Sequence, residues 1–349
     1  MKIGILTGGG DCPGLNAVIR GAVRKSLLLG YEVYGLRNGW KGLLEKNYYK
    51  LDHQAISGIL HRGGTILGSS RTNLYQEGKN YYQQAIENYK ELGLDALIAI
   101  GGEDTLGVAA KLYKDGLNII GVPKTIDNDL NATDYTFGFD TAVNIATEAI
   151  DRLHTTAESH NRVIVVEVMG RHAGWIALHS GLAGGADITL IPEKPFKLDE
   201  VCDVLTKRHG RGKSFSIVVI AEGAKIHTED GTDKDGSFVL QKLEKDAFGH
   251  VSLGGIGNIV ADEIERRTGY ETRAVVLGHI QRGGTPTAFD RVLGSRFGVK
   301  AAELVEKKDF GKMTSLQGTR IVPVSLDDAV GTLKTVDDEI YKTAETFFG

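Results

Sequence analysis

Acidic side chains and one lysine follow two short runs of apolar, β-branched residues. The first run is followed by Glu103 and Asp104, and the second is followed by Lys124, Asp127 and Asp129. Carboxylates can hold Mg²⁺ or accept a proton from an attacking hydroxyl, and a lysine can neutralise phosphate oxygens. Together, these residue types suit the transfer of a phosphoryl group.

A glycine-rich turn over residues 8–14 joins the first apolar run to a segment of helical period. Such a turn presents free backbone N–H groups and the positive end of a helix dipole to an anion. It is not GxGxxG, because Pro13 interrupts that pattern, and it is not a P-loop, because no lysine closes it. The turn suits a phosphate cradle, although taken alone it equally suits a tight strand-to-helix connection.

Arginines and further glycines occupy comparable places in the second half of the chain. Arginine forks match phosphate oxygens bidentately, so these positions are candidate anion ligands. They are Arg162, Met169–Arg171, Glu222, Arg273, His279 and Arg282. The ten histidines form no HExxH pair, so a zinc enzyme is not expected.

Apolar β-branched runs recur along the chain and predict buried parallel strands. Segments of helical period lie between them, including residues 15–30 and a long helix from Asp140. Alternating strands and helices predict a doubly wound α/β architecture, in which ligands bind beyond the carboxyl ends of the strands. The predicted strands cover residues 2–7, 95–100, 118–122, 163–168, 187–191, 215–221 and 272–277.

The chain has 349 residues, more than twice the roughly 150 residues of a typical domain, which predicts two domains. We place a boundary near Gly138. The polar stretch 227–237 indicates an exposed loop, and the tail over 326–349 is typical of one more amphipathic helix.

Composition excludes several classes of function. With 41 Lys and Arg against 45 Asp and Glu, the net charge of −4 offers no global positive field to nucleic acid. No apolar run approaches the roughly 18 residues of a membrane-spanning helix, so no membrane association is expected. Cys12 and Cys202 match no disulfide framework or thiolate metal site, which favours a cytoplasmic protein.

Seven motifs in the chain match one known family in order. They are TGGGDCPGLNAVIR, RGGTILGSSR, GGEDT, PKTIDND, SHNRVIVVEVMGRHAGW, AEG and TRAVVLGHIQRGG, and they extend from Thr7 to about Arg296. On these residues the chain resembles the bacterial-type phosphofructokinases and, among them, the pyrophosphate-dependent members. The resemblance implies two α/β domains with the active site in the cleft between them. Residues 1–138 and about 281–325 would form the phosphoryl-donor domain, and 139–280 with a C-terminal helix over 326–349 would form the sugar-phosphate domain.

The resemblance also implies roles for single residues. Asp127 would accept the proton of the sugar C1 hydroxyl, and Glu103 and Asp129 would hold Mg²⁺. Gly10 and Arg71 would bind the phosphoryl donor. Matches to the positions that hold fructose 6-phosphate are Thr125, Met169, Gly170, Arg171, Glu222, His279 and Arg282. The expected catalytic set is Asp127, Asp104, Lys124 and Arg171.

Two further implications concern assembly and the donor. Arg162 and Arg273 match arginines that reach the sugar phosphate from a neighbouring subunit, which implies a homo-oligomer, a dimer or tetramer, with shared active sites. Asp104 and Lys124 stand where ATP-using members have glycine. This departure favours pyrophosphate and a reversible reaction that gives fructose 1,6-bisphosphate in glycolysis or gluconeogenesis. The alternatives are an ATP-dependent 6-phosphofructokinase and a catalytically silent sugar-phosphate sensor.

Overall fold

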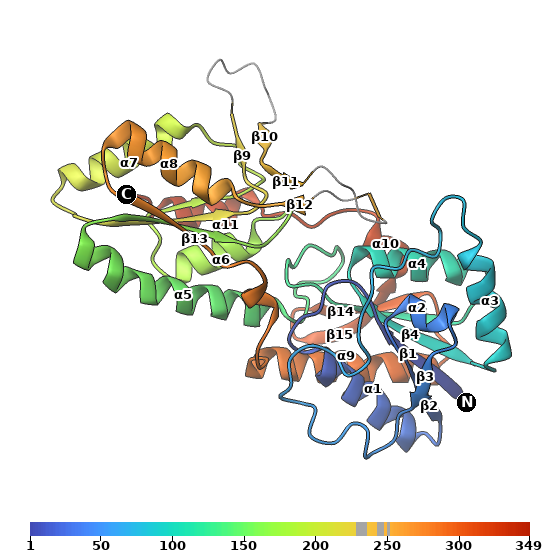
Figure 1. Ribbon diagram of the computed structural model, residues 1–349. Coiled ribbons are helices and arrows are strands. Elements are labelled where there is room, and N and C mark those ends of the chain that lie inside the picture. The colour runs from blue at the N-terminus through green and yellow to red at the C-terminus, as the bar shows by residue number, and fades with distance from the viewer. Residues whose placement is uncertain (228–235, 243–247, 250–251) are drawn as a thin grey trace.

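The β-branched runs form the strands of two sheets, each at the centre of one of two lobes (Figure 1). The computed structural model describes residues 1–227, 236–242, 248–249 and 252–349. Helices cover both faces of each sheet, as strands that are apolar on both sides require. The predicted fold of two α/β units is confirmed.

The sheet of the first lobe has seven strands in the order β15-β14-β5-β4-β1-β2-β3. The strands from β14 to β2 are parallel, and the edge strands β15 and β3 are antiparallel to their neighbours. Their bounds are β1 (Lys2–Thr7), β2 (Glu32–Leu36), β3 (Tyr48–Lys50), β4 (Ala96–Gly101), β5 (Ile119–Pro123), β14 (Lys312–Gln317) and β15 (Arg320–Ser325).

Two sets of helices sandwich this sheet. On one face lie α1 (Leu15–Leu28) and α9 (Ala288–Glu306), and on the other lie α2 (Trp40–Leu44), α3 (Tyr81–Glu91), α4 (Glu103–Lys114) and α10 (Leu326–Val330). A Cβ on Gly298 of α9 would overlap the carbonyl oxygen of Val18 in α1. This glycine therefore lets the two helix backbones approach each other closely.

The sheet of the second lobe has four parallel strands in the order β13-β6-β8-β7. The strands are β6 (Val163–Val168), β7 (Ile188–Leu190), β8 (Ser216–Ala221) and β13 (Thr272–Val276). One face is covered by α5 (Phe139–His160), α6 (Trp175–Ala183) and α11 (Asp338–Glu345), and the other by α7 (Leu198–Gly210) and α8 (Ile256–Thr268). A short 3₁₀ helix, η1 (Gly278–Arg282), leads from β13 to α9.

Four short strands pair near one end of this lobe. They are β9 (Lys225–Ile226) with β10 (Ser237–Phe238), and β11 (Leu240–Lys242) with β12 (Ser252–Leu253). The predicted polar loop of 227–237 falls here, and its residues 228–235 lie outside the described residues.

The structure corrects the sequence prediction in the tail. The single helix predicted over 326–349 is wrong, because α10 and α11 are separate helices joined by residues 331–337. Helix α10 packs on α4 in the first lobe, whereas α11 packs on α6 in the second. The break therefore lets the chain cross between the lobes.

Asp290 joins the two lobes through the start of α5. Its carboxylate, fully buried, accepts the backbone N–H of Gly138 at 2.9 Å and the N–H and hydroxyl of Thr141 at 2.9 and 2.5 Å. These are donors at the N-terminus of α5, where a negative charge is favoured. Asp290 itself lies in the first turn of α9, so one side chain fixes α5 relative to α9.

We expect Asp290→Ala to lower the free energy of unfolding by about 2–5 kcal/mol, because two buried N–H groups lose their acceptor. Urea unfolding followed by circular dichroism measures this change. The matched control is Asp151→Ala on the exposed face of α5, expected within about 0.5 kcal/mol of the unmodified chain. A loss below about 1 kcal/mol for Asp290→Ala would show that the capping carboxylate is dispensable.

Candidate active site

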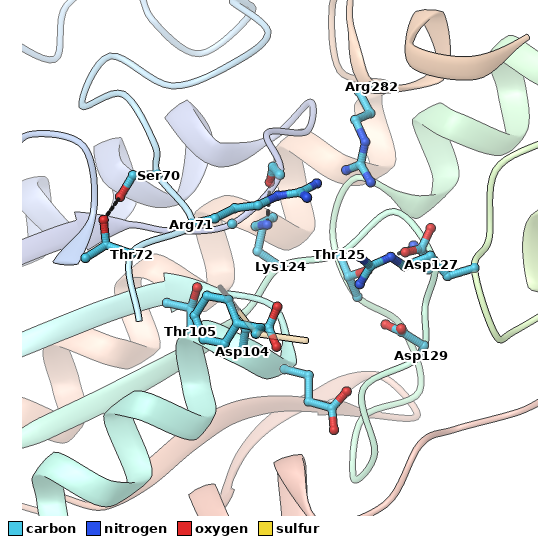
Figure 2. Close-up of a pocket in the computed structure, with 16 residues that line it drawn as sticks. Ser70, Arg71, Thr72, Asp104, Thr105, Lys124, Thr125, Asp127, Asp129 and Arg282 are labelled. Atoms are coloured by element: carbon cyan, nitrogen blue, oxygen red, sulfur yellow. Dashed lines mark hydrogen bonds between the residues drawn. The ribbon is translucent and has the colours of Figure 1, made fainter. Parts of the chain in front are cut away.

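The loops that follow β1, β4 and β5 meet at the carboxyl ends of these strands, where they line a pocket (Figure 2). The second lobe closes this pocket. The pocket encloses about 760 Å³, counting the part open to solvent. Of the residues singled out from the sequence, it brings together Gly10, Arg71, Glu103, Asp104, Lys124, Thr125, Asp127, Asp129, Arg171 and Arg282. The other lining residues, to which the sequence assigned no individual role, are Gly9, Ser70, Thr72, Gly102, Thr105 and Phe248.

Lys124 lies beneath the glycine turn. Its side chain is 4 % exposed, and its ammonium donates a hydrogen bond to the carbonyl oxygen of Gly10. Burial lowers the pKa of Lys124, and the nearby charge of Asp127 acts in the opposite direction. The lysine thus brings a cationic group to the place where the turn offers backbone N–H groups to an anion.

Arg282 covers the same turn from the other side. Its Nη1 donates to the carbonyl oxygen of Asp11 at 3.3 Å, and a Cβ on Gly10 would lie 2.6 Å from that nitrogen. A side chain at position 10 would therefore displace the guanidinium. The lysine and the arginine enclose the glycine turn between two cations, an arrangement that suits a phosphate.

Asp127 is the buried carboxylate of the loop after β5. It is 5 % exposed, and its backbone N–H donates to Thr125 Oγ1 at 3.0 Å, which fixes the start of the loop. Its Oδ1 is buried and finds no hydrogen-bond partner among the residues that the structure describes. A buried carboxylate oxygen without a donor is unfavourable, so this atom suits a hydroxyl that a ligand would bring.

Asp129 stands two residues further along, close to other carboxylates. Burial raises its pKa to about 7, and repulsion from Asp127 and, more weakly, from Glu103 adds to that rise. A cation would relieve this repulsion. Within the described residues no three acidic, histidine or cysteine side chains form a preassembled metal cluster. Mg²⁺ does not need one, because it commonly binds one or two carboxylates, water and substrate phosphates.

The second lobe closes the pocket with the turn after β6. Arg171 has φ of 46°, and its backbone N–H donates to Glu222 Oε1 at 3.3 Å. A Cβ on Gly223 would overlap the carbonyl oxygen of Arg171, so only glycine fits beside this turn. Burial raises the pKa of Glu222 to about 7, and the charge of Asp127 from the opposite lobe contributes. The acidic groups of the two lobes are therefore close enough to interact electrostatically.

Other sequence-predicted residues lie beside this pocket or far from it. Met169 and Gly170 adjoin Arg171 in the same turn, while His279 is exposed in η1 and does not line the pocket. Arg162 and Arg273 lie at the amino ends of β6 and β13, and both bind Glu271 at 2.7 Å. A six-residue strand spans roughly 20 Å, so these arginines stand a strand length away from the carboxyl ends that face the pocket.

A glycine turn, facing cations and clustered carboxylates between two α/β lobes define a phosphotransferase site. A family model described as Phosphofructokinase matches residues 2–305. The chain belongs to this family, and the resemblance inferred from its motifs is confirmed.

Relatives named for two different donors are similar over the whole chain. A pyrophosphate--fructose 6-phosphate 1-phosphotransferase of Amycolatopsis methanolica is 59% identical, with 100% of both chains covered. An ATP-dependent 6-phosphofructokinase of Streptomyces coelicolor is 57% identical, with 99% of both chains covered. Overall identity therefore does not separate the two donors, and residues in the site have to.

Solved structures give the same fold. Pichia pastoris phosphofructokinase in the T-state matches with a TM-score of 0.84 and 32% identity over 99% of this chain, which spans 39% of that longer chain. A pyrophosphate-dependent phosphofructokinase from Marinobacter aquaeolei matches with a TM-score of 0.81 and 23% identity, covering 97% of this chain and 86% of that one. Among the described residues, no helix has the length and apolar character that crossing a bilayer requires.

Proposed function

We propose that the chain transfers a phosphoryl group from pyrophosphate to the C1 hydroxyl of fructose 6-phosphate, giving fructose 1,6-bisphosphate and phosphate, reversibly. The observation that carries the proposal is the buried Oδ1 of Asp127, which has no hydrogen-bond partner among the described residues and lies in a pocket shared with the glycine turn and Lys124. A general base needs a free acceptor within reach of the hydroxyl, and phosphoryl transfer needs cations around the phosphates. Membership of the phosphofructokinase family supports both assignments.

In this reaction Asp127 accepts the proton of the C1 hydroxyl as its oxygen attacks phosphorus. The bond between that phosphorus and the bridging oxygen breaks, and the leaving phosphate departs near Gly10 and Lys124. Arg71 and Arg171, which line the same pocket, face the transferred group and balance its charge. In this proposal the donor lies at the glycine turn and the sugar lies toward the second lobe.

The crowded carboxylates suit Mg²⁺. Asp129 and Glu103 would hold the ion, whose charge would offset the burial and the repulsion from Asp127 that raise the pKa of Asp129. Mg²⁺ would draw charge from the phosphate oxygens of the donor.

The sugar phosphate is assigned to the second lobe. Glu222 and the Met169–Arg171 turn would hold its hydroxyls, and Arg282 its phosphate, with Thr125 supporting it from the first lobe. His279 is also assigned to this ligand, although it is exposed in the single chain. Arg162 and Arg273 are assigned to the sugar phosphate of a neighbouring subunit, because they face away from the pocket of their own chain.

A second subunit would also cover apolar surface on the elements that follow Arg273 in the chain. Val276 is 49% exposed, Ile280 60%, Phe289 43% and Val292 59%, and all four lie on the consecutive elements β13, η1 and α9. Apolar groups gathered in this way are typical of an interface. They support a homo-oligomer, a dimer or tetramer, with shared active sites.

Both cysteines are free, which supports a cytoplasmic location.

Asp104 supports pyrophosphate as the donor. It lies in the first turn of α4 and lines the pocket together with Lys124. Its side chain takes room that the α-phosphate of ATP would need, and its charge repels that phosphate. The second candidate, phosphorylation by ATP, is favoured by the 57% identity to a relative named for that donor.

Removal of the proposed base tests the reaction itself. Asp127→Ser should lower kcat by about 10² to 10⁴ fold, with KM much less affected, because the proton acceptor is lost. A coupled assay of fructose 1,6-bisphosphate formation with each donor measures the effect, and Asp151→Ser on the exposed face of α5 is the control. Near-full kcat for Asp127→Ser would refute the role. If the unmodified chain binds fructose 6-phosphate without turnover, the alternative of a catalytically silent sugar-phosphate sensor is supported instead.

Two substitutions at position 104 separate space from charge in donor choice. Asp104→Gly should permit ATP use by removing both the side chain and its charge, whereas Asp104→Asn removes the charge alone and should permit less. The ratio of kcat/KM for the two donors at saturating Mg²⁺ is the measurement. Our account of the donor is wrong if the unmodified chain prefers ATP or if Asp104→Gly leaves the ratio unchanged.

Mixed oligomers test the shared site. Arg162→Ala and Asp127→Ser subunits should each be nearly inactive, but a hybrid contains a site with Asp127 from one subunit and Arg162 from the other. Random mixing leaves about a quarter of all sites without either lesion, so activity should return to about a quarter of the wild-type value. Verified hybrids without recovery would mean that Arg162 serves no neighbouring site.

A further inference from the structure

The segment 331–337 joins α10 to α11 and passes behind the loop that carries the proposed base; we call it the connector. It runs from the first lobe to the second, as the red part of the chain shows in Figure 1. Leu333 forms a β-bridge with Leu130, and the backbone N–H of Lys334 donates to the carbonyl oxygen of Asp129 at 2.8 Å. The connector thus binds the backbone of the loop between Asp127 and Thr136, outside the pocket.

The ammonium group of Lys334 completes this attachment. It donates to Asn128 Oδ1 at 3.1 Å and to the carbonyl oxygens of Thr133 and Asp134 at 2.9 Å each. An ammonium has three donors, and here all three reach acceptors of one loop. The bonds tie the start of the loop to its end.

Asn128 is the residue that this ammonium fixes, and it separates the two acidic residues of the loop. It is 2 % exposed and has φ of 52°, in the left-handed region, so its backbone turns the chain sharply between Asp127 and Asp129. Its Oδ1 also accepts the backbone N–H of Thr136 at 3.0 Å. Without a cation at this oxygen, the side chain that holds the turn would lose its one charge-assisted hydrogen bond to the connector.

The other side of the connector holds the second lobe. The carbonyl oxygen of Lys334 accepts the indole N–H of Trp175 at 3.0 Å, and the ammonium lies 5.5 Å from the centre of that ring. Two residues on, the backbone N–H of Val336 donates to Glu193 at 2.9 Å, and the same carboxylate accepts the N–H of Gly174 at 3.0 Å. Gly174 and Trp175 begin α6, directly after the turn that carries Arg171.

From these contacts we infer that Lys334 is a positioning residue, which holds the Asp127–Asp129 turn in reactive geometry and sets it against the Arg171 turn of the other lobe. Lys334 does not line the pocket, so it acts through Asn128 and Trp175. The inference rests on the proposed function, because it assumes that Asp127 is the reacting base. A displacement of about 1 Å at a reacting group can cost roughly 10²-fold in rate, so loosening this loop would be felt in turnover.

Lys334→Met tests the inference, because it removes the three donors and keeps the length of the side chain. We expect kcat to fall by about 10- to 100-fold with KM changed less than about threefold, in assays well below the melting temperature of the variant. The control is Lys342→Met on the exposed face of α11. Trp175→Phe, which keeps an aromatic ring but removes the N–H to Lys334, should lower kcat by a smaller factor and serves if Lys334→Met does not fold.

Hydrogen exchange gives a readout that needs no turnover. The amide of Thr136 should exchange at least about tenfold faster in Lys334→Met, because its acceptor Asn128 is no longer held, and Lys342→Met should exchange like the unmodified chain. Unchanged exchange at 125–136, or kcat within threefold of wild type, would overturn the role of Lys334. Absent turnover in the unmodified chain would reject the proposed function instead, and the exchange result would still decide whether Lys334 holds the loop.

Discussion

The cleft depends on the burial of carboxylates close to one another. Burial and the charge of Asp127 raise the pKa of Asp129 and of Glu222, one in each lobe, to about 7. Such groups are costly to hold together in a low-dielectric site unless cations arrive with a ligand. Lys124 offsets part of this charge from below the glycine turn. The remaining excess matches a reaction whose substrates bring phosphates accompanied by a divalent metal.

The parallel strands decide which residues can take part. Loops at the carboxyl ends of β1, β4, β5 and β6 converge on the cleft, whereas residues at the amino ends of the strands lie at the opposite end of each sheet. Arg171 and Arg162 therefore flank the same strand but serve different surfaces. The connector adds a third kind of contribution, because it binds the loop between Asp127 and Thr136 without entering the pocket. This contribution depends on bonds between residues that are some 200 positions apart in the chain, such as Lys334 and Asn128.

Much of the site could be predicted from sequence, because each motif follows a β-branched run and such runs end at one sheet edge. Predicted strands such as 163–168 match the structure, and most others differ by one or two residues at their ends. The strand β14 escaped prediction, because KMTSLQ has no β-branched run and becomes a strand by pairing with β5 and β15. The amphipathic pattern of the tail predicted one helix instead of two, because the break after α10 depends on where the second lobe lies. Lys334 and Phe248 gave no local signal at all, because their partners are distant in sequence.

The pairing of β14 with β5 has a consequence for how the protein is made. Both the sheet and the α1 face of the first lobe stay incomplete until residues 288–325 leave the ribosome, which happens after the second-lobe elements from α5 to β13 have been synthesised. Until then, the edge of β5 offers unpaired backbone groups and α1 shows an uncovered apolar stripe. Contacts of such long sequence separation form slowly. The nascent chain therefore passes through a stage in which most of the second lobe has been made while the first lobe is still incomplete. Aggregation at that stage is the hazard that chaperones would have to prevent.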